Sequence, residues 1–324
     1  DPAAPTPSVN QRYSIALDMA HNGKPGAARV LYQQLARTDL SDSRRASLHA
    51  ELPNYPSPQA LKLADADLHN PSPQVRKAAI QSIVGLVPSA QRTLLLGALL
   101  DDEEQSVRFA AANALLGLSP DEQGLYFGPL QQMIDEFERD LKTRPDDPQA
   151  QGQLARLYLH EGQLDEAQAA LEQVTRLDPD NLKAVVAQID LLDKRGRPDQ
   201  ARELLARQLE AHPDSAYLQH ALGIWLLNHG QTEYALLGLA KAVELEPDNS
   251  DYRYKLATAL YDLDQLEAAQ RQLEELLQRQ PANRRARVLL IRYWKEAGQL
   301  QNVQVLLAQL EQQNPDDPAL QQGL

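Results

Sequence analysis

Apolar residues recur at intervals of three and four along most of this chain, and short polar stretches interrupt them. The first such run begins near Tyr13 and continues through Leu17 and Val30, with the dipeptide Asn22-Gly23 as its break. Side chains spaced in this way share one face of a helix, and Asn-Gly is a frequent turn sequence. The pattern predicts an all-α chain that opens with a pair of helices.

Prolines recur at one constant interval through the second half of the chain, and two positions after each comes Asp, Asn or Ser. Proline ends a helix because it has no N–H and its ring clashes with the preceding turn. Asp, Asn and Ser are the side chains that best cap the start of a helix. Each pair therefore predicts one helix end and the next helix start. The pairs are Pro145 and Asp147, Pro179 and Asn181, Pro213 and Ser215, Pro247 and Asn249, Pro281 and Asn283, and Pro315 and Asp317.

Small residues recur inside each period of this array. Gly223 stands at the eighth position of its period and Ala235 at the twentieth. Ala also stands at the twentieth position of three of the other four periods and at the eighth position of two. Small side chains at such positions allow two helices to cross closely. A glycine between the two expected helices supplies the left-handed residue that ends the first one. In the fourth period Asp264 takes this place, and the glycines are Gly162, Gly196, Gly230 and Gly298.

These positions resemble the tetratricopeptide repeat (TPR), a unit of two helices with a period of about 34 residues. The resemblance assigns five TPR units to residues 145–317. It implies a right-handed superhelix in which the first helices of the units line a concave groove. We therefore expect an α-solenoid as the fold class.

In the part of the chain before this array, arginines and prolines recur at a slightly shorter interval. Arginines recur at Arg44, Arg76 and Arg108, and prolines recur at Pro56, Pro88 and Pro120. The segment Asn70–Arg76 resembles the corner of HEAT-like repeats, which assigns such repeats to residues 10–124. We expect Arg76 and Arg108 to pair with acidic groups at the repeat corners. We also expect the prolines to end the second helix of each repeat, before the next repeat begins.

Three shorter segments complete the predicted division of the chain. Residues 1–9 form a Pro/Ala-rich tail or linker, and residues 125–144 form a linking helix between the two arrays. Residues 318–324 are the start of a truncated capping helix, too short to cover the end of a repeat array. The TPR array is therefore expected to be open at its C-terminal end. Either it continues in a parent protein or a partner covers its end.

Composition excludes several classes of function. The chain has 45 acidic and 32 basic residues, a net charge of −13 and a pI of about 5.0, which argues against nucleic acid as its partner. It has no cysteine, and its seven histidines lack metal-binding spacing. No stretch is apolar enough to span a membrane. We predict a non-enzymatic protein with no cofactor, no metal and no membrane insertion, whose partner is a protein or peptide.

The TPR resemblance also selects the residues that face the groove. Its central part would be aromatic and the end formed by the fifth unit would be basic. Tyrosine and arginine are frequent anchors of interfaces. The alternative for Tyr254 and Tyr261 is that they pack against neighbouring helices. The same positions also select Asp190 and Asp251, and the predicted partner-binding residues are Arg156, Tyr217, His220, Ile224, Tyr254, Thr258, Tyr261, Arg285, Arg292 and Lys295.

The order of HEAT-like repeats, linking helix and TPR units also looks like the C-terminal repeat region of bacterial multihaem c-type cytochromes. That resemblance implies export to the periplasm, with the cytoplasm as the alternative. The haem-bearing part, with its CxxCH sites, is absent from these residues. Two other functions therefore stay open beside a peptide-binding scaffold. One is a docking or regulatory appendage of a multihaem redox protein, and the other is a structural module that self-associates through the open C-terminal end.

Overall fold

A computed structural model describes residues 5–322, and every regular element within this range is a helix. The α-solenoid class predicted from the sequence is confirmed. The chain forms two compact units. Unit 1 contains the residues up to Leu130 and those from Leu273 onward, and unit 2 contains Gln131–Gln272. No helix of the described part of the chain is long and apolar enough to cross a membrane.

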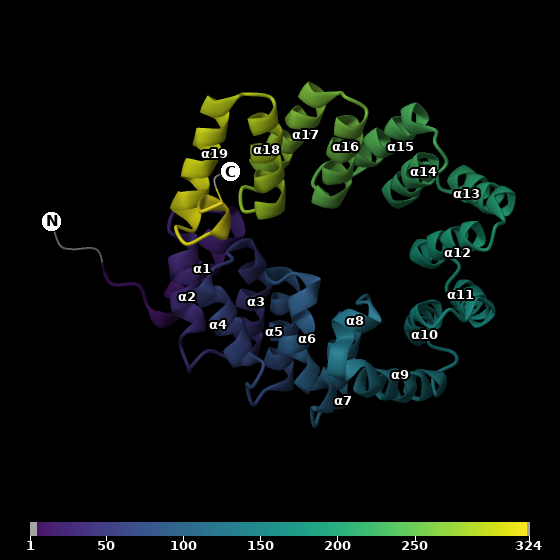
Figure 1. Cartoon of the computed structure of the whole chain (residues 1–324), viewed down its shortest axis with the longest axis horizontal. Coiled ribbons are helices and arrows are strands. Elements are labelled where there is room, and N and C mark those ends of the chain that lie inside the picture. The colour runs from purple at the N-terminus through teal and green to yellow at the C-terminus, as the bar shows by residue number, and fades with distance from the viewer. Residues whose placement is uncertain (1–4, 323–324) are drawn as a thin grey trace. The chain divides into compact units, whose positions relative to one another are not determined.

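The N-terminal segment of unit 1 is a series of short helices joined by tight turns (Figure 1). Ser8, Ser41, Ser57, Ser72 and Ser119 each accept a hydrogen bond from a backbone N–H in the first turn of the helix that follows. The helices are α1 (Val9–Asn22), α2 (Ala27–Leu35), α3 (Asp42–Glu51), η1 (Leu52–Asn54), α4 (Pro58–Asp67), α5 (Pro73–Leu86), α6 (Ser89–Leu96), η2 (Gly97–Asp101), α7 (Gln105–Leu115), α8 (Pro120–Gln123) and η3 (Gly124–Tyr126).

The regularly spaced prolines of this segment do not stand where the sequence predicted them. Pro56 and Pro88 precede α4 and α6, and Pro120 is the first residue of α8. These are the second helices of their pairs, so each proline stands between the two helices of a repeat and not at the end of the repeat. The fixed φ of proline suits the first turn of a helix as well as it suits a stop. Spacing alone could not separate these two roles.

Arg76 holds the corner between α5 and the start of α7. Its Nε and Nη2 atoms donate to the two carboxylate oxygens of Asp102, each at 2.9 Å, and both side chains are more than nine-tenths buried. Nη1 donates to the carbonyl oxygens of Asn70 and Pro71 at 2.9 and 3.0 Å. Arg108 likewise donates to the carbonyl of Asp102 at 2.8 Å. The structural role predicted for Arg76, pairing with a carboxylate at a repeat corner, is confirmed.

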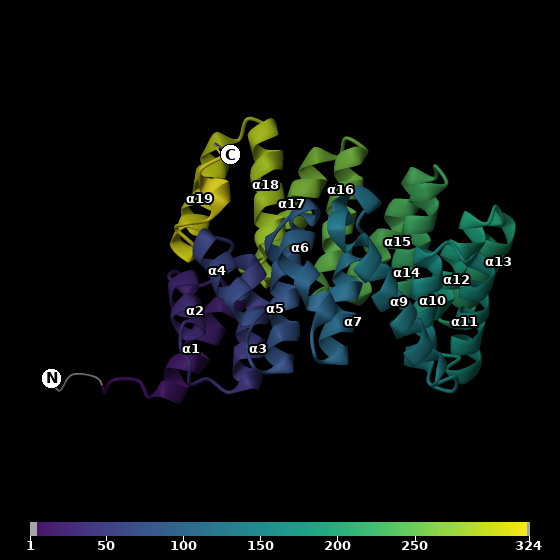
Figure 2. The same cartoon turned by 60° about the horizontal axis from the view of Figure 1, so that its bottom comes forward.

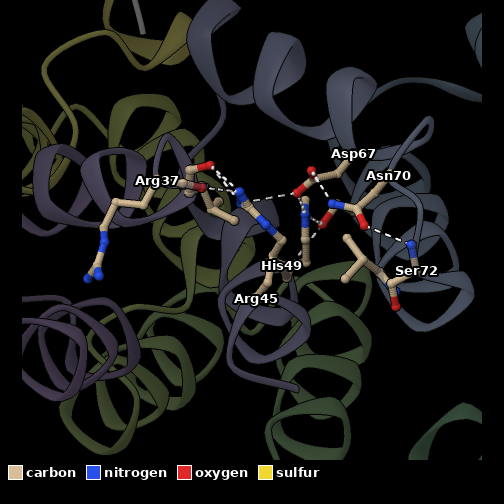
Figure 3. Close-up of polar contacts among 9 residues, drawn as sticks. Arg37, Arg45, His49, Asp67, Asn70 and Ser72 are labelled. Carbon is tan, nitrogen blue, oxygen red and sulfur yellow. Dashed lines mark hydrogen bonds and ion pairs between the residues drawn. The ribbon is translucent and has the colours of Figure 1, made fainter. Parts of the chain in front are cut away.

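A buried polar network joins α3, α4 and α5 (Figure 3). His49 Nε2 lies 2.6 Å from Asp67 Oδ2, and its Nδ1 lies 3.0 Å from the hydroxyl of Ser82, which itself donates to the His49 carbonyl at 2.8 Å. Arg45 Nη1 lies 3.5 Å from the same carboxylate oxygen and donates to the Leu35 carbonyl. Each buried polar group thus has a partner, as burial in a helical core requires.

The C-terminal segment of unit 1 packs against its N-terminal segment. The Gly26 nitrogen, at the start of α2, donates to the Gln312 carbonyl at 2.8 Å, and the Arg284 nitrogen donates to Asn54 Oδ1 at 3.3 Å. Both views show the end of α19 beside α2 (Figures 1 and 2). The end of the helix array is therefore covered by the chain itself, which corrects the expected open C-terminal end. This segment contains the last turns of α17 (Leu266–Arg279), then α18 (Arg284–Glu296), α19 (Leu300–Gln313) and η4 (Pro318–Leu320).

Unit 2 consists of helix pairs whose ends follow the predicted signals. The side-chain oxygens of Asp147, Asn181, Ser215 and Asn249 each accept from the backbone N–H two or three residues later. Asp264 has a φ of 61°, so it takes the left-handed place of the glycines as predicted. The helices are most of α9 (Phe127–Lys142), then α10 (Pro148–His160), α11 (Leu164–Leu177), α12 (Leu182–Lys194), α13 (Pro198–Ala211), α14 (Ala216–Asn228), α15 (Thr232–Leu245), α16 (Ser250–Asp262) and the start of α17.

The two helices of the pair α14–α15 cross at the small residues selected by the sequence. A Cβ atom on Gly223 would lie 2.6 Å from the side chain of Leu239 and 3.1 Å from the carbonyl oxygen of Ala235. Ala235 is fully buried. The predicted close approach at the eighth and twentieth positions of the period is confirmed for this pair.

Candidate functional site

The first helices of the pairs in unit 2, α10, α12, α14 and α16, follow one another along one side of the unit, and α11, α13 and α15 follow one another along the other (Figure 1). Seven of the ten predicted binding residues lie on these first helices. Arg156 on α10 is exposed, and the other six are partly buried. Those six are Tyr217, His220 and Ile224 on α14, and Tyr254, Thr258 and Tyr261 on α16.

The three basic residues of the prediction lie in the other unit. Arg285, Arg292 and Lys295 are on α18, which belongs to unit 1, and all three are exposed. The Arg292 guanidinium lies 5.9 Å from the ring centre of Tyr293. The predicted aromatic centre and the predicted basic end therefore belong to different units.

His220 and Tyr252 form the centre of the site in unit 2. Their rings stack with centroids 4.6 Å apart and an angle of 26° between the ring planes. Tyr252 is buried, and His220 Nδ1 is a buried atom with no hydrogen-bond partner. A buried polar atom without a partner is costly, and in a native protein it marks a place where a partner is expected. We call Tyr217, His220 and Tyr252 the tyrosine–histidine cluster.

Electrostatics keep the His220 ring neutral near pH 7. Burial, followed by the positive charge of Lys255, lowers the pKa of His220, and the carboxylate of Asp251 opposes this shift. A neutral imidazole carries one N–H donor and one acceptor nitrogen. The ring can therefore either donate to or accept from a polar group that reaches Nδ1.

Asp190 of α12 adds negative charge beside the tyrosine–histidine cluster. Burial raises the pKa of Tyr217, and the charge of Asp190 raises it further. The pKa of Asp190 is itself raised by burial and by Asp193. Asp190 is exposed, and its pKa is nevertheless raised because the surrounding helices exclude water from part of its environment. The two causes of this pKa shift are burial and the negative charge of Asp193, and no positively charged group opposes them among the described residues.

A second aromatic arrangement links α12 and α14. The rings of Trp225 and His229 stack with centroids 3.9 Å apart, and His229 Nε2 lies 2.9 Å from Asp193 Oδ2. Trp225 also packs against the buried apolar cluster that contains Val185, Ile189 and Leu205. Trp225 Nε1 and Asp193 Oδ1 are buried atoms that lack hydrogen-bond partners. Buried polar atoms without hydrogen-bond partners thus occur at two places on α12 and α14.

In residues 5–322 no group of three or more His, Asp and Glu side chains is placed to hold a metal ion. In unit 1 the hydrogen-bonded residues Ser82, His49 and Asp67 have the residue types of a hydrolase triad. Ser82 and His49 are each only 1% exposed, and the serine hydroxyl donates to a backbone carbonyl, so these residues serve the core. The tyrosine–histidine cluster, in contrast, combines phenol rings and an imidazole, with the carboxylates of Asp190 and Asp251 near it.

The sequence predicted part of this site. Tyr217, His220, Asp190 and Asp251 occupy positions that the repeat resemblance selects, and they interact in the structure. Tyr252, the ring that stacks on His220, was missed because its register position is not one of those positions. Its place next to Asp251 gives no such signal, because adjacent residues of a helix point in different directions.

Comparison with known proteins supports the repeat assignment. One family model described as tetratricopeptide repeat matches residues 134–189 and 159–223, and a second model with the same description matches residues 254–302. A comparison with curated protein sequences gave no significant match. The HEAT-like assignment of residues 10–124 stays a prediction.

Solved structures of repeat proteins resemble parts of the chain at low identity. A thermophilic TPR protein from Thermus thermophilus, TTC0263, is 23% identical, with a TM-score of 0.44, over 63% of this chain and 98% of that one. YrrB, described as a TPR protein with an unusual peptide-binding site, is 18% identical, with a TM-score of 0.38, over 59% of this chain and 98% of that one. MamA from Desulfovibrio magneticus is 18% identical, with a TM-score of 0.34, over 59% and 95%.

Proposed function

We propose that this tetratricopeptide repeat protein is a protein-interaction scaffold, and that its tyrosine–histidine cluster binds an extended peptide segment of a partner. Tetratricopeptide repeats matched over α10–α14 and α16–α18 support protein interaction as the general function. The observation that carries the finer proposal is His220. Its ring is stacked in place by Tyr252, and its Nδ1 atom is buried without a partner.

The chemistry of the cluster, with Tyr254 on α16 and Asp190 on α12, indicates what kind of peptide fits. Tyr217 and Tyr254 are partly buried, so a partner can cover the remaining ring surface, and such rigid aromatic side chains often contribute strongly to interfaces. The neutral His220 ring can pair with a backbone N–H or C=O of an extended chain. Asp190 has a raised pKa that a cation would lower, so a lysine or arginine near Asp190 would add a favourable interaction. We infer a peptide with an apolar or aromatic residue close to a basic one.

A selection experiment tests this function. Random peptides displayed on phage are selected against the full chain, and the selected peptides are titrated into the wild type and into Tyr217→Ala and Tyr254→Ala variants. The matched control is Tyr234→Ala, which removes a tyrosine that is 65% exposed on α15, the second helix of the same repeat as Tyr217. We expect Tyr217→Ala in the cluster and Tyr254→Ala on α16 each to weaken binding by about tenfold or more, and the control to leave it unchanged. A selection that yields no binder, or binders that depend on Tyr234 instead, would overturn the proposal.

We also propose that the basic residues of α18 contact a partner, as a separate surface of unit 1. Exposed arginine and lysine side chains contribute to steering and to specificity more than to affinity. Charge reversal of Arg292 and Lys295 should therefore slow association with an acidic partner segment and reduce its dependence on salt. Unchanged association rates at low salt would count against this role.

Three finer assignments stay predictions. They are the HEAT-like character of residues 10–124, the division of the chain at residues 124, 144 and 317, and the likeness to the repeat region of multihaem cytochromes with its implied periplasmic location. An upstream coding region with several CxxCH sites would favour the role of a docking appendage of a redox protein.

A further inference from the structure

Unit 1 contains a cavity of about 530 Å³ in a region distinct from the proposed peptide site. Its lining comes from the turn after α1, from the end of α17, and from α18 and α19. The apolar part of the lining includes Leu277, Leu290, Trp294 and Leu306, and Val305 stands at the edge with 56% of its surface exposed. Cavities of this size hold small organic ligands in other proteins.

Arg287 is the one basic residue of this lining, and it is only 3% exposed. It donates through Nη1 to Gln309 Oε1 and through Nη2 to the carbonyl of Pro281 at 2.7 Å. Its Nε atom is buried and has no partner, and no ion pair to a carboxylate is formed by Arg287 within residues 5–322. Burial lowers the pKa of Arg287. A buried guanidinium stays charged, and without a counter-ion it is costly.

The neighbouring repeats show which part of this arrangement belongs to the repeat itself. Arg253, at the equivalent position one repeat earlier, donates in the same way to the carbonyl of Pro247 and to Gln272. Gln219, at the equivalent position of the repeat before that, donates to the carbonyl of Pro213 at 3.1 Å. The bond to the proline carbonyl is thus a feature of the fold, and a glutamine can make it. The positive charge of Arg287 beside an apolar cavity is not needed for that bond.

We propose that the cavity in unit 1 binds an aliphatic carboxylate, with its hydrocarbon chain against Leu277, Leu290 and Trp294 and its carboxylate paired with Arg287. Burial of a hydrocarbon chain is favourable by roughly 0.8 kcal/mol per CH₂. Arginine pairs with carboxylates through two parallel N–H donors, and the pairing would supply the counter-ion that Arg287 lacks.

The charges around the cavity place the carboxylate at one end. Glu274 is the one acidic residue of the lining, and it is exposed. A ligand carboxylate would be repelled near Glu274 and attracted near Arg287, so the buried end of the cavity takes the charged group. The remaining polar lining residues, Gln278, Asn302, Gln309, Gln312 and Gln313, are uncharged amides.

Intrinsic fluorescence can measure this binding directly. The chain has two tryptophans, Trp225 and Trp294, so a Trp225→Phe variant of the full chain leaves Trp294 as the only reporter inside the cavity. Decanoate is titrated at pH 7.5 and compared with decanol, which has the same chain length and no charge. We expect a saturable change in Trp294 emission with decanoate, and at least tenfold weaker binding of decanol.

Arg287→Gln removes the charge but keeps a side chain that can donate to Pro281, as Gln219 does to Pro213. It should weaken decanoate binding about tenfold and leave decanol binding unchanged. Arg253→Gln is the matched control in the neighbouring repeat and should change neither. Val305→Asp, at an exposed position, should weaken both ligands, and Glu274→Gln should strengthen decanoate binding only. Far-UV circular dichroism confirms that each variant is folded.

The wild-type comparison of decanoate with decanol does not depend on any Arg287 variant. Equal binding of the two ligands, or no saturable response to decanoate, would overturn the proposal. Decanoate binding that is unaffected in a folded Arg287→Gln variant would also overturn it. Because the cavity lies in unit 1, these outcomes are independent of peptide binding by the tyrosine–histidine cluster in unit 2.

Discussion

The side-chain amide of Asn314 donates to the carbonyl oxygen of Pro56 at 2.8 Å, which joins two residues 258 positions apart in the sequence. Asn314 follows the last helix of the repeat array and is 1% exposed. Pro56 lies in the turn before α4. The bond is one of several that fasten the two chain segments of unit 1 together, and it explains why the last repeat needs no separate capping helix.

Replacement of Asn314 by Ala should destabilise unit 1. The change leaves the Pro56 carbonyl without its donor in a partly buried position, which costs about 1–3 kcal/mol. Urea unfolding gives the free energy, and hydrogen exchange should show faster exchange around residues 52–56. The control is Asn302→Ala on α19, which removes an exposed amide that bonds Gln299. Equal stability of the Asn314→Ala and Asn302→Ala variants would contradict this role of Asn314.

Gly23 tests a second contact between the two chain segments of unit 1. It ends α1 with a φ of +62°, and a Cβ atom there would lie 2.7 Å from the carbonyl carbon of Pro281. Gly23→Ala therefore adds a steric clash to the strain of the left-handed conformation, together costing about 2–4 kcal/mol. Gly162→Ala is matched, because Gly162 has a φ of +74° with open space around it, and should cost only about 1 kcal/mol. Thermal unfolding of the two variants measures the difference, and equal losses would refute the close approach.

The ion pair between Arg76 and Asp102 should be strongly coupled. Both side chains are buried, so Arg76→Met leaves an unpaired carboxylate in the core and should cost about 3–5 kcal/mol. The double variant Arg76→Met with Asp102→Leu should recover much of this loss, because neither charge is then left alone. Urea unfolding of the single and double variants gives the coupling energy. Losses that simply add would show that the pair has no special role.

Stability should depend on Glu161 between about pH 5 and 8. Burial, and then the negative charges of Glu138 and Asp135, raise the pKa of Glu161 from its ordinary value of 4.5 to about 7. The folded state therefore binds this proton more tightly than the unfolded state. Its stabilising contribution is complete below about pH 4.5 and is lost as the pH rises through about 7. A raised pKa thus predicts lower stability at the alkaline end.

Glu161→Gln removes this titration and should make the melting temperature less dependent on pH between 5 and 8. Glu210→Gln, at an exposed position on α13, is the control and should keep the dependence of the wild type. Melting curves at half-unit steps of pH are sufficient. Identical pH profiles for the wild type and the Glu161→Gln variant would contradict the assignment.

The local features of the fold could be predicted because their causes are local. The cap at Asn249, the left-handed Asp264 and the close crossing at Gly223 each depend on residues within one repeat. Proline was less informative, since Pro56 and Pro88 precede helices where the sequence predicted helix ends. A proline restricts φ in the same way in both places, so its spacing predicted the period but not the position within the repeat.

The remaining features depend on contacts between distant residues. Nothing near Asn314 in the sequence indicates Pro56, and nothing near His49 indicates the carboxylate of Asp67 and the hydroxyl of Ser82. The candidate site was partly predictable, because Tyr217 and His220 follow the repeat register. The stacking of Tyr252 on His220 depends on how two successive repeats pack, which the register does not give.

The most direct test of the proposed function is to observe the His220 ring itself. The full chain is labelled with ¹⁵N in its histidine rings, and a peptide obtained by selection is added at pH 7.5 while NMR follows the ring nitrogens. We predict that the His220 Nδ1 resonance shifts with the same saturation as peptide binding, whereas the ring of buried His49 in unit 1 does not respond. Saturation by the peptide with an unchanged His220 resonance would contradict the claim that this cluster is the binding site.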